Sequence, residues 1–253
     1  MIFTNLIQAN LRTKIFGRQI EYYQRLGSTN VEAWDLIKLG EAENGMIIIT
    51  DNQFAGKGRN ANNWYMSPSK GLAMTLIILD SLPIETALLI PLAAGLATAK
   101  ALTNRGADPK LKWPNDIFIN EKKCGGILCE TQISNGIVQK MVIGFGLNIN
   151  EKEEDLDLTI KEKSTSLSIE TGHSNQRELI AAIITTYFEQ ILDNTSIVQA
   201  EWSNYCYHQD KEISFKYNGI VQNGIFRGIS SNGIANIEVD NEIREFPSIT
   251  LNN

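Results

Sequence analysis

The chain has 253 residues, 43% hydrophobic and 21% charged, which provides a core for one large domain or for a medium domain with a small partner. Its formal charge of −6 argues against broad nucleic-acid binding, because such binding depends on neutralising phosphates. Residues 1–14 lack a signal peptide's apolar stretch, no run approaches the length of a membrane span, and three cysteines suit a reducing cytoplasm better than a disulfide framework.

The first predicted elements are a helix and two strands. The helix, over 28–40, opens with a capping box at Thr29–Glu32. The apolar runs at 46–50 and 72–79 predict strands. Between them lies the polar segment 54–71, FAGKGRNANNWYMSPSKG, which is far longer than a hairpin turn requires. A loop of this length inside a compact domain indicates a functional role.

Two further helices are predicted. The first covers 91–104, and Pro91 suits its first turn. The second, roughly 176–192, is amphipathic and starts behind Asn175, with Glu178 placed to complete a cap.

Between these helices the apolar pattern has a period of two. Strands are expected at 117–119, 125–131 and 137–149, with Asn135-Gly136 as a hairpin turn. An acidic surface stretch is expected at 151–157. The larger part of the chain is therefore predicted to be α+β, with a mainly antiparallel sheet and flanking helices.

The local sequence pattern changes after Tyr207. Short β-like runs, separated by Asn-Gly and Asp-Asn pairs, predict a small β-barrel of about 45 residues docked on the main body. The predicted domains are 1–208 and 209–253.

The polar segment carries a formal dinucleotide fingerprint, G-x-G-x-x-A, at 56–61. That motif requires a helix immediately after it, and Pro68 with several helix-breaking residues argues against one. No Walker A motif occurs in the chain. A mobile surface loop remains an alternative, but Trp64 offers a flat surface for stacking and Arg59 offers a planar fork for an anion. A loop of this kind could close over an anionic ligand.

A second cluster, KWPNDIFINEKKCGGILCE, covers 112–130. Two turns separate its strands, so Lys112, Asp116 and Lys123 can lie together at the opening of one site. Two ordinary turns with solvated lysines remain the alternative. With two histidines in the chain, a zinc site or a Cys–His couple is not expected, and Cys124 and Cys129 are interpreted as small core side chains.

Taken together, these stretches resemble the biotin protein ligases. That family carries G-R-G-R-x-x-x-x-W-x-S-P-x-G, K-W-P-N-D and K-x-x-G-I-L-x-E. This chain has GKGRNANNW followed by SPSKG, KWPND at 112–116 and KCGGILCE at 123–130. Further matches are Ser28-Thr29-Asn30, Gln53, GFGLN at 144–148 and STSL at 164–167. The chain departs from the family at Lys57 and at Asn60-Ala61-Asn62, where arginines and glycine are usual, which predicts weaker loop closure and adenylate retention.

The resemblance implies a fold like that of class II aminoacyl-tRNA synthetases and biotin ligases, with a C-terminal SH3-like barrel. It also implies a reaction in two steps. Biotin and ATP, with Mg²⁺, give biotinyl-AMP and pyrophosphate, and a lysine of a biotin carboxyl-carrier domain then attacks the adenylate. The implied enzyme is cytoplasmic and monofunctional, without an N-terminal DNA-binding domain and without nucleic-acid or membrane partners.

The resemblance also assigns site residues. The catalytic group is Arg59, Lys123, Asp116 and Lys112. Biotin binding is assigned to Ser28, Thr29, Asn30, Gln53, Lys57, Gly58, Arg59, Lys123 and Gly126. Nucleotide binding is assigned to Arg59, Trp64, Asn115, Lys123 and Asn148, and magnesium to Asp116 and Asn148. Asp116 could act as a base toward the acceptor lysine, bind metal, or cap its own turn.

Two other functions stay open at this point. A lipoate or octanoate ligase or transferase shares the fold, but it would need a long apolar slot and lacks the pairing of KWPND with GxGR. A non-catalytic module that holds a small anion is the second alternative. The sequence does not distinguish a monomer from a homodimer, and it does not identify the acceptor protein.

Overall fold

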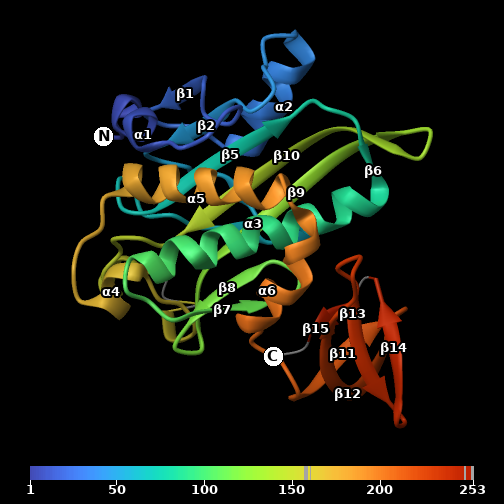
Figure 1. Ribbon diagram of the computed structural model, residues 1–253. Helices are drawn as coiled ribbons and strands as arrows, with labels where there is room; N and C mark the ends of the chain where they lie inside the picture. Colours follow the sequence, from blue (N-terminus) through green and yellow to red (C-terminus); the bar gives the residue numbers. More distant parts are fainter. Residues whose placement is uncertain (157–158, 160, 248, 252–253) are drawn as a thin grey trace.

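The computed structural model describes residues 1–156, 159, 161–247 and 249–251. A large mixed sheet, covered by helices, is joined at the C-terminal end by a smaller antiparallel sheet (Figure 1). The strands of the large sheet are β1 (Ile20–Tyr23), β2 (Ile47–Thr50), β5 (Leu72–Ile78), β6 (Leu82–Pro83), β7 (Pro109–Lys112), β8 (Asp116–Ile119), β9 (Lys122–Ser134) and β10 (Ile137–Leu147). The α-helices are α1 (Thr4–Asn10), α2 (Thr29–Leu39), α3 (Ile84–Asn104), α4 (Leu167–Thr171), α5 (Arg177–Leu192) and α6 (Val198–Asn204).

The large sheet has the order β1-β2-β5-β10-β9-β8-β7, and β6 pairs with one end of β10. Its pairings are antiparallel except for that between β1 and β2. The fold class is therefore confirmed as α+β with a mainly antiparallel sheet. The β9–β10 hairpin turns at Asn135-Gly136, and both residues have positive φ, as the Asn-Gly pair predicts.

The two faces of this sheet bury different sets of side chains because neighbouring strand residues point to opposite faces. On β2, Ile47 and Ile49 join the main core, together with apolar side chains of α3 and α5. Ile48, between them, packs with Ala33 and Ile37 of α2 in a separate cluster. Helices α3 and α5 lie side by side on one face (Figure 1), and α2 covers part of the other.

Helix α3 differs from its prediction. It begins at Ile84, so that Pro91 lies inside it and not in its first turn. It is the one helix, among the residues described, that is long and apolar enough to cross a membrane, and 67% of its apolar stretch is buried inside the fold. Buried alanines and Gly95 face its neighbours, which is typical of a core helix.

The predicted cap boxes of two helices are wrong, although the helices are present. In α2 the N-cap is Ser28, and Glu32 instead accepts a hydrogen bond from the hydroxyl of Tyr23, at 2.9 Å. In α5 the N-cap is Gln176, and Glu178 accepts from the backbone N–H of Phe3, at 3.1 Å. In both cases a glutamate expected to cap its own helix binds a group outside that helix.

The acidic stretch expected on the surface at 151–157 is only partly there. Glu153 and Glu154 are exposed, but Glu151 is 1% exposed. Neither carboxylate oxygen of Glu151 has a hydrogen-bond partner among the residues described. Residue 157 lies outside the described residues.

The C-terminal strands are β11 (Glu212–Tyr217), β12 (Ile220–Ile229), β13 (Ala235–Val239), β14 (Glu242–Phe246) and β15 (Thr250–Leu251). They form an antiparallel sheet of order β14-β13-β12-β11-β15, which confirms an all-β segment. Its closure into a barrel, and the domain boundary after residue 208, stay predictions.

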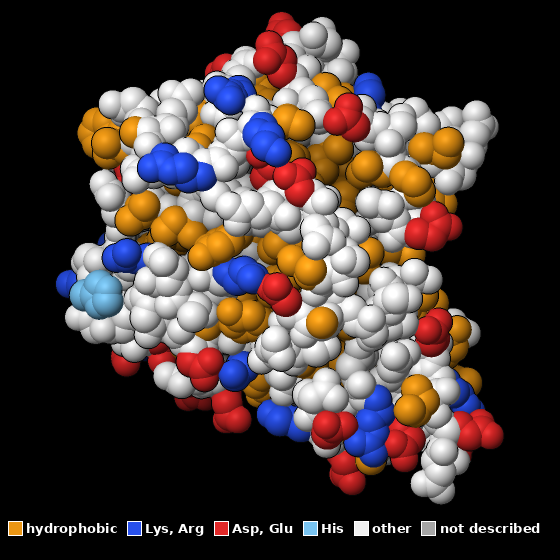
Figure 2. Space-filling model, viewed as in Figure 1, with side chains coloured by type: hydrophobic (Ala, Val, Ile, Leu, Met, Phe, Trp, Pro, Cys, Tyr) orange, Lys and Arg blue, Asp and Glu red, His pale blue; other side chains and the backbone are white. Residues whose placement is uncertain are grey.

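The small sheet is docked on the main body, since its buried Phe215 and Phe226 belong to the same core as α3 and α5. Trp113 Nε1 donates to the carbonyl of Gly233 at 3.1 Å, which ties the two parts together. On the face shown in Figure 2, acidic and basic side chains are interspersed, and they gather together over this sheet. Arg227 there pairs with both Asp210 and Glu238.

Candidate active site

The polar segment 54–71 contains secondary structure of its own. Strands β3 (Gly56–Lys57) and β4 (Asn63–Trp64) form a short hairpin around the 3₁₀ turn η1 (Arg59–Ala61). The central part of the predicted loop is therefore a small hairpin of its own. This hairpin forms one wall of a cleft of about 260 Å³, and β8, β9 and β10 contribute to the rest of its lining.

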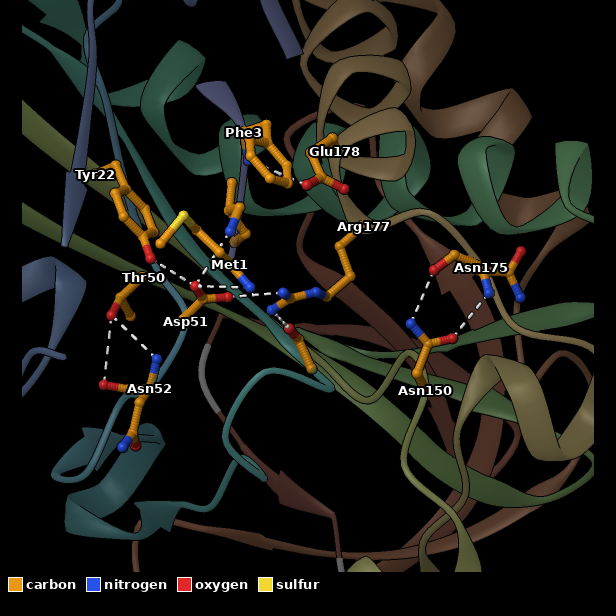
Figure 3. Close-up of polar contacts among 12 residues, drawn as sticks. Met1, Phe3, Tyr22, Thr50, Asp51, Asn52, Asn150, Asn175, Arg177 and Glu178 are labelled. Carbon is orange, nitrogen blue, oxygen red and sulfur yellow. Dashed lines mark hydrogen bonds and ion pairs between the residues drawn. The ribbon is translucent and has the colours of Figure 1, made fainter. Parts of the chain in front are cut away.

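A buried ion pair holds the base of this hairpin (Figure 3). Arg177 of α5 donates through Nη2 to Asp51 Oδ1 at 2.7 Å and through Nη1 to the carbonyl of Gly71 at 3.2 Å. Asp51 lies just before the segment and Gly71 at its end, so one guanidinium holds both ends. The backbone N–H of Ser69 also donates to the carbonyl of Asp51, at 2.8 Å.

Asp51 is stabilised as a carboxylate by its neighbours. Burial alone would raise its pKa, but the hydroxyl of Tyr22 donates to Oδ2 at 2.6 Å and Arg177 pairs with Oδ1, and together they hold the pKa below its ordinary value. The amino group of Met1 also lies 3.4 Å from Oδ2. The hairpin thus rises from a rigid, charge-paired base.

Arg59 and Lys123, two of the predicted cationic residues, both contact the turn at 115–116. Arg59 Nη1 donates to Asn115 Oδ1 at 3.1 Å, and Asn115 Nδ2 donates to the carbonyl of Ile127 at 2.8 Å. Burial lowers the pKa of Arg59, and nearby Asp116 partly offsets this. Lys123 Nζ lies 2.7 Å from Asp116 Oδ1, and both side chains are partly exposed to the cleft.

Lys112 completes the cationic cluster. Lys112 stands opposite Asp116 in the register of β7 and β8, and its ammonium lies 5.4 Å from the centre of the Phe118 ring. Burial lowers its pKa, Asp116 opposes this shift, and the positive charges of Lys123 and Lys163 add to it. Partly dehydrated cations next to one another bind a polyanion strongly, because water screens them less.

The opposite end of the cleft is polar and almost uncharged. Ser28, Thr29 and Asn30 line it from the start of α2, and Gln53 lines it from the segment after β2. All four are buried. The backbone N–H of Thr29 donates to Gln53 Oε1 at 2.9 Å, which fixes the orientation of this amide.

Trp64 lies at the end of the hairpin, against β10. A Cβ atom at Gly146 would lie 2.7 Å from Trp64 Cε2, so the indole occupies the space that a larger residue would fill. The indole N–H is buried and has no hydrogen-bond partner within the described part of the chain. This donor and the flat ring are both directed at the cleft lining.

The structure brings nearly all the predicted site residues together. Lys57, Gly58 and Gly126 also line the cleft. Asn148 is not among the lining residues described: its Nδ2 donates to the carbonyl of Thr165 at 2.9 Å, and its backbone N–H donates to the carbonyl of Cys124, next to Lys123.

Sequence reasoning missed part of the lining. Gly144 and Gly146 of β10 were noticed only within a family motif, and nothing indicated that Ile249 and Leu251 of the C-terminal segment close the cleft. The last two lie some hundred positions beyond the other lining residues, so local patterns carry no signal for them.

This arrangement suits a molecule with a polar ring at one end and an anionic group at the other. The uncharged end offers oriented amide and hydroxyl groups, and the cationic end can hold phosphate against a carboxylate. Asp116 is the one acidic side chain among the cleft-lining residues described, and it is available for proton transfer or metal binding.

Comparison with known proteins gives a consistent picture. The sequence model of the biotin/lipoate A/B protein ligase family matches residues 22–148. The bifunctional ligase/repressor BirA of Bacillus subtilis (strain 168) is 29% identical over 255 residues, covering 97% of this chain and 77% of that protein. The biotin–[acetyl-CoA-carboxylase] ligase of Paracoccus denitrificans is 29% identical over 219 residues, covering 83% of this chain and 90% of that protein.

Among solved structures, the biotin protein ligase from Aquifex aeolicus in complex with biotin and ATP superposes with a TM-score of 0.79 at 25% sequence identity. The match covers 93% of this chain and 99% of that one. The similarity therefore extends over almost the whole chain, including the segments that form the cleft.

Proposed function

The chain belongs to the biotin/lipoate A/B protein ligase family, and we propose that it is an ATP-dependent biotin protein ligase. One observation carries this proposal: a buried polar pocket and a cluster of three cations share one cleft. Biotin has a polar ureido ring at one end and a carboxylate at the other, so it fits this polarity. A lipoyl ring would bring no hydrogen-bonding partner to the polar end, which disfavours lipoate.

The first step joins biotin's carboxylate to the α-phosphate of ATP and releases pyrophosphate. Two anions repel each other, and fixed cations in a partly dry cleft reduce that repulsion. We assign this role to Arg59 and Lys123, with Lys112 in support. Asn115, which accepts a hydrogen bond from Arg59, positions the guanidinium. Trp64 packs near the nucleotide.

The second step is attack by an acceptor lysine on the adenylate. A lysine with a pKa near 10.4 costs about 4–5 kcal/mol to deprotonate at pH 7. Asp116 lies in the cleft with one oxygen against Lys123, and we assign it to accept the proton or to align the amine. The acceptor is the biotin carboxyl-carrier domain of a carboxylase, and the reaction takes place in the cytoplasm.

Mg²⁺ enters the proposal as a partner of ATP. This ion is usually held by one or two carboxylates together with substrate phosphates, and Asp116 is a suitable carboxylate. Asn148, whose Nδ2 donates to the carbonyl of Thr165, is the second residue assigned to the ion, through its Oδ1. When bound, the ion would neutralise phosphate charge. In this proposal residues 1–208 form the catalytic domain and 209–253 a small domain docked on it.

A labelling assay tests the function. The protein is incubated with ATP, Mg²⁺, a carboxyl-carrier domain and either biotin or lipoate. The mass of the carrier domain is then measured by mass spectrometry. Addition of one biotinyl group, dependent on ATP and absent when the carrier's lysine is replaced, is expected. Labelling by lipoate but not biotin would show a lipoate ligase, and binding of biotin without any labelling would show a binding module.

A further inference from the structure

A chain of hydrogen bonds lies behind the polar end of the cleft. On three neighbouring strands, Thr75, Gly144 and Leu128 stand side by side in register. A Cβ atom at Gly144 would collide with Asn30 Oδ1, so the missing side chain makes room for the amide of Asn30. Asn30, from the first turn of α2, therefore lies between β5 on one side and β9 on the other.

The contacts of Asn30 fix the orientation of its amide. Nδ2 donates to the carbonyl of Leu128 at 3.2 Å and to Glu130 Oε2 at 2.8 Å, and both partners are acceptors. The other end, Oδ1, can only accept. The hydroxyl of Thr75, 2.7 Å away, therefore donates its proton to Asn30.

This donation determines the direction of the next hydrogen bond. Thr75 Oγ1 and Thr29 Oγ1 are 2.8 Å apart. A hydroxyl carries one proton, and that of Thr75 is already used, so Thr29 must donate to Thr75. Thr29 then has only lone pairs left for the cleft. Gln53 Oε1 accepts the backbone N–H of Thr29 and lies 3.3 Å from Thr29 Oγ1. It is a second, more distant acceptor for the same hydroxyl proton of Thr29.

We propose that Thr75, Asn30 and Glu130 are positioning residues that fix Thr29 as a hydrogen-bond acceptor, so that this end of the cleft selects a ligand with a ring N–H. Thr75 is fully buried, and neither it nor Glu130 is among the cleft-lining residues described, so both act through others. The inference rests on the proposed function, because the ureido ring of biotin supplies such N–H groups. A site built to accept an N–H strongly rejects an analogue that lacks it.

Binding of ligand analogues tests this inference. The probes are biotin and its two carbamate analogues, in each of which an oxygen replaces one ring N–H. Calorimetry on the unmodified protein is expected to show one carbamate binding on the order of 100-fold more weakly than biotin, since two acceptors then face each other. In Thr75→Val the hydroxyl of Thr29 can turn and donate to the ring oxygen, so this ratio should fall at least roughly 10-fold.

Matched variants separate positioning from a general loss of structure. Thr75→Ser keeps the hydroxyl and should keep the ratio. Thr98→Val removes another fully buried hydroxyl, which donates to the carbonyl of Ala94 inside α3, and should also keep it. If Thr75→Val does not fold, Asn30→Ala removes the acceptor of Thr75's proton and should lower the ratio in the same way.

Several outcomes would overturn the inference. An unchanged ratio in folded Thr75→Val or Asn30→Ala would do so, as would an equal weakening of all three ligands. Equal affinity of the unmodified protein for biotin and both carbamates would refute the assignment of Thr29 as a fixed acceptor but leave biotin binding intact. Failure of the unmodified protein to bind biotin at all would overturn the proposed function and this inference with it.

Discussion

Lys123 and Asp116 meet across β8 and β9, with Lys123 Nζ 2.7 Å from Asp116 Oδ1. One carboxylate thus neutralises an amine of the enzyme before a second amine, from the acceptor, reaches the cleft. The other oxygen of Asp116 is the atom that could receive the acceptor's proton, and the two residues should affect different steps of the reaction.

Replacing Asp116 by Asn should slow transfer more than adenylation, because the amide keeps the size of the side chain and loses the charge. The loss could approach the roughly 10²–10⁴-fold typical of a general base. A single-turnover assay that starts from preformed biotinyl-AMP measures this step alone. Normal transfer from the preformed adenylate, combined with failure to make it, would instead show that Asp116 binds nucleotide or metal.

Lys123→Ala should abolish adenylate formation, since the anionic transition state loses a fixed cation. ATP–pyrophosphate exchange measures this, and circular dichroism checks that the fold persists. Lys122→Ala provides the control, because Lys122 is the adjacent lysine in the sequence and is exposed to solvent. An exchange rate within a few-fold of the unmodified protein would mean that the wrong lysine has been assigned.

Arg59→Gly should let biotinyl-AMP escape into solvent, where exposed lysines of unrelated proteins can react with it. The guanidinium, held by Asn115, is expected to retain the adenylate as well as to help form it. Labelling of a bystander protein measures the escape. Arg59→Lys keeps the charge without the planar fork and should give an intermediate level. Bystander labelling no higher than that of the unmodified protein contradicts the assignment.

Amide hydrogens of residues 56–64 should exchange more slowly when biotin and ATP are both present. The hairpin there is short, and Arg177 already holds Asp51 before it and Gly71 after it, so protection should be concentrated between these two residues. Hydrogen exchange with mass spectrometry measures this. Equal exchange with and without ligands would argue against a hairpin that closes over them.

Glu151→Gln should stabilise the protein at alkaline pH. Burial raises the pKa of Glu151 from 4.5 to about 7, and nearby backbone groups offset this only in part. Between these values the folded protein holds a proton that the unfolded chain has lost, so the contribution to stability is full below pH 4.5 and is lost as the pH rises through 7. The amide cannot ionise, so the gain at pH 8 should reach about 3 kcal/mol.

Urea unfolding at pH 5 and pH 8 measures this difference. Glu154→Gln is the matched control, because that side chain is exposed and should change the free energy of unfolding little at either pH. A similar gain for Glu151→Gln at pH 5 and pH 8 would show that ionisation is not its cause.

The strands and helices could be predicted wherever the apolar period was regular, as in β9 and β10 with their Asn-Gly turn. Helix caps could not. Glu32 and Glu178 have the spacing of local caps, but Tyr23 of β1 and the backbone of Phe3, which the fold brings to them, bind them instead. The start of α3 was misplaced because Pro91 suits a first turn, whereas the helix begins seven residues earlier, at Ile84.

The residues of the cleft also fall into those that could be predicted from the sequence and those that could not. Arg59, Asp116 and Lys123 stand in motifs with strong side-chain chemistry, so the sequence draws attention to them. Thr75 sits in an ordinary strand pattern, and Glu130 only ends a family motif, so their roles become visible only where three strands and a helix meet. Glu151 appeared to belong to an acidic surface, because composition does not indicate which member of a charged run turns inward.

The contribution of Ile249 and Leu251 to the cleft wall has a consequence for folding during translation. A ribosome releases the pocket around Thr29 and the cations around Lys123 long before it has made residue 251. A nascent chain can therefore fold its large sheet and still lack part of the wall around its substrates. That wall is complete only once β15 has been made, and translation that stops before β15 would leave it unfinished.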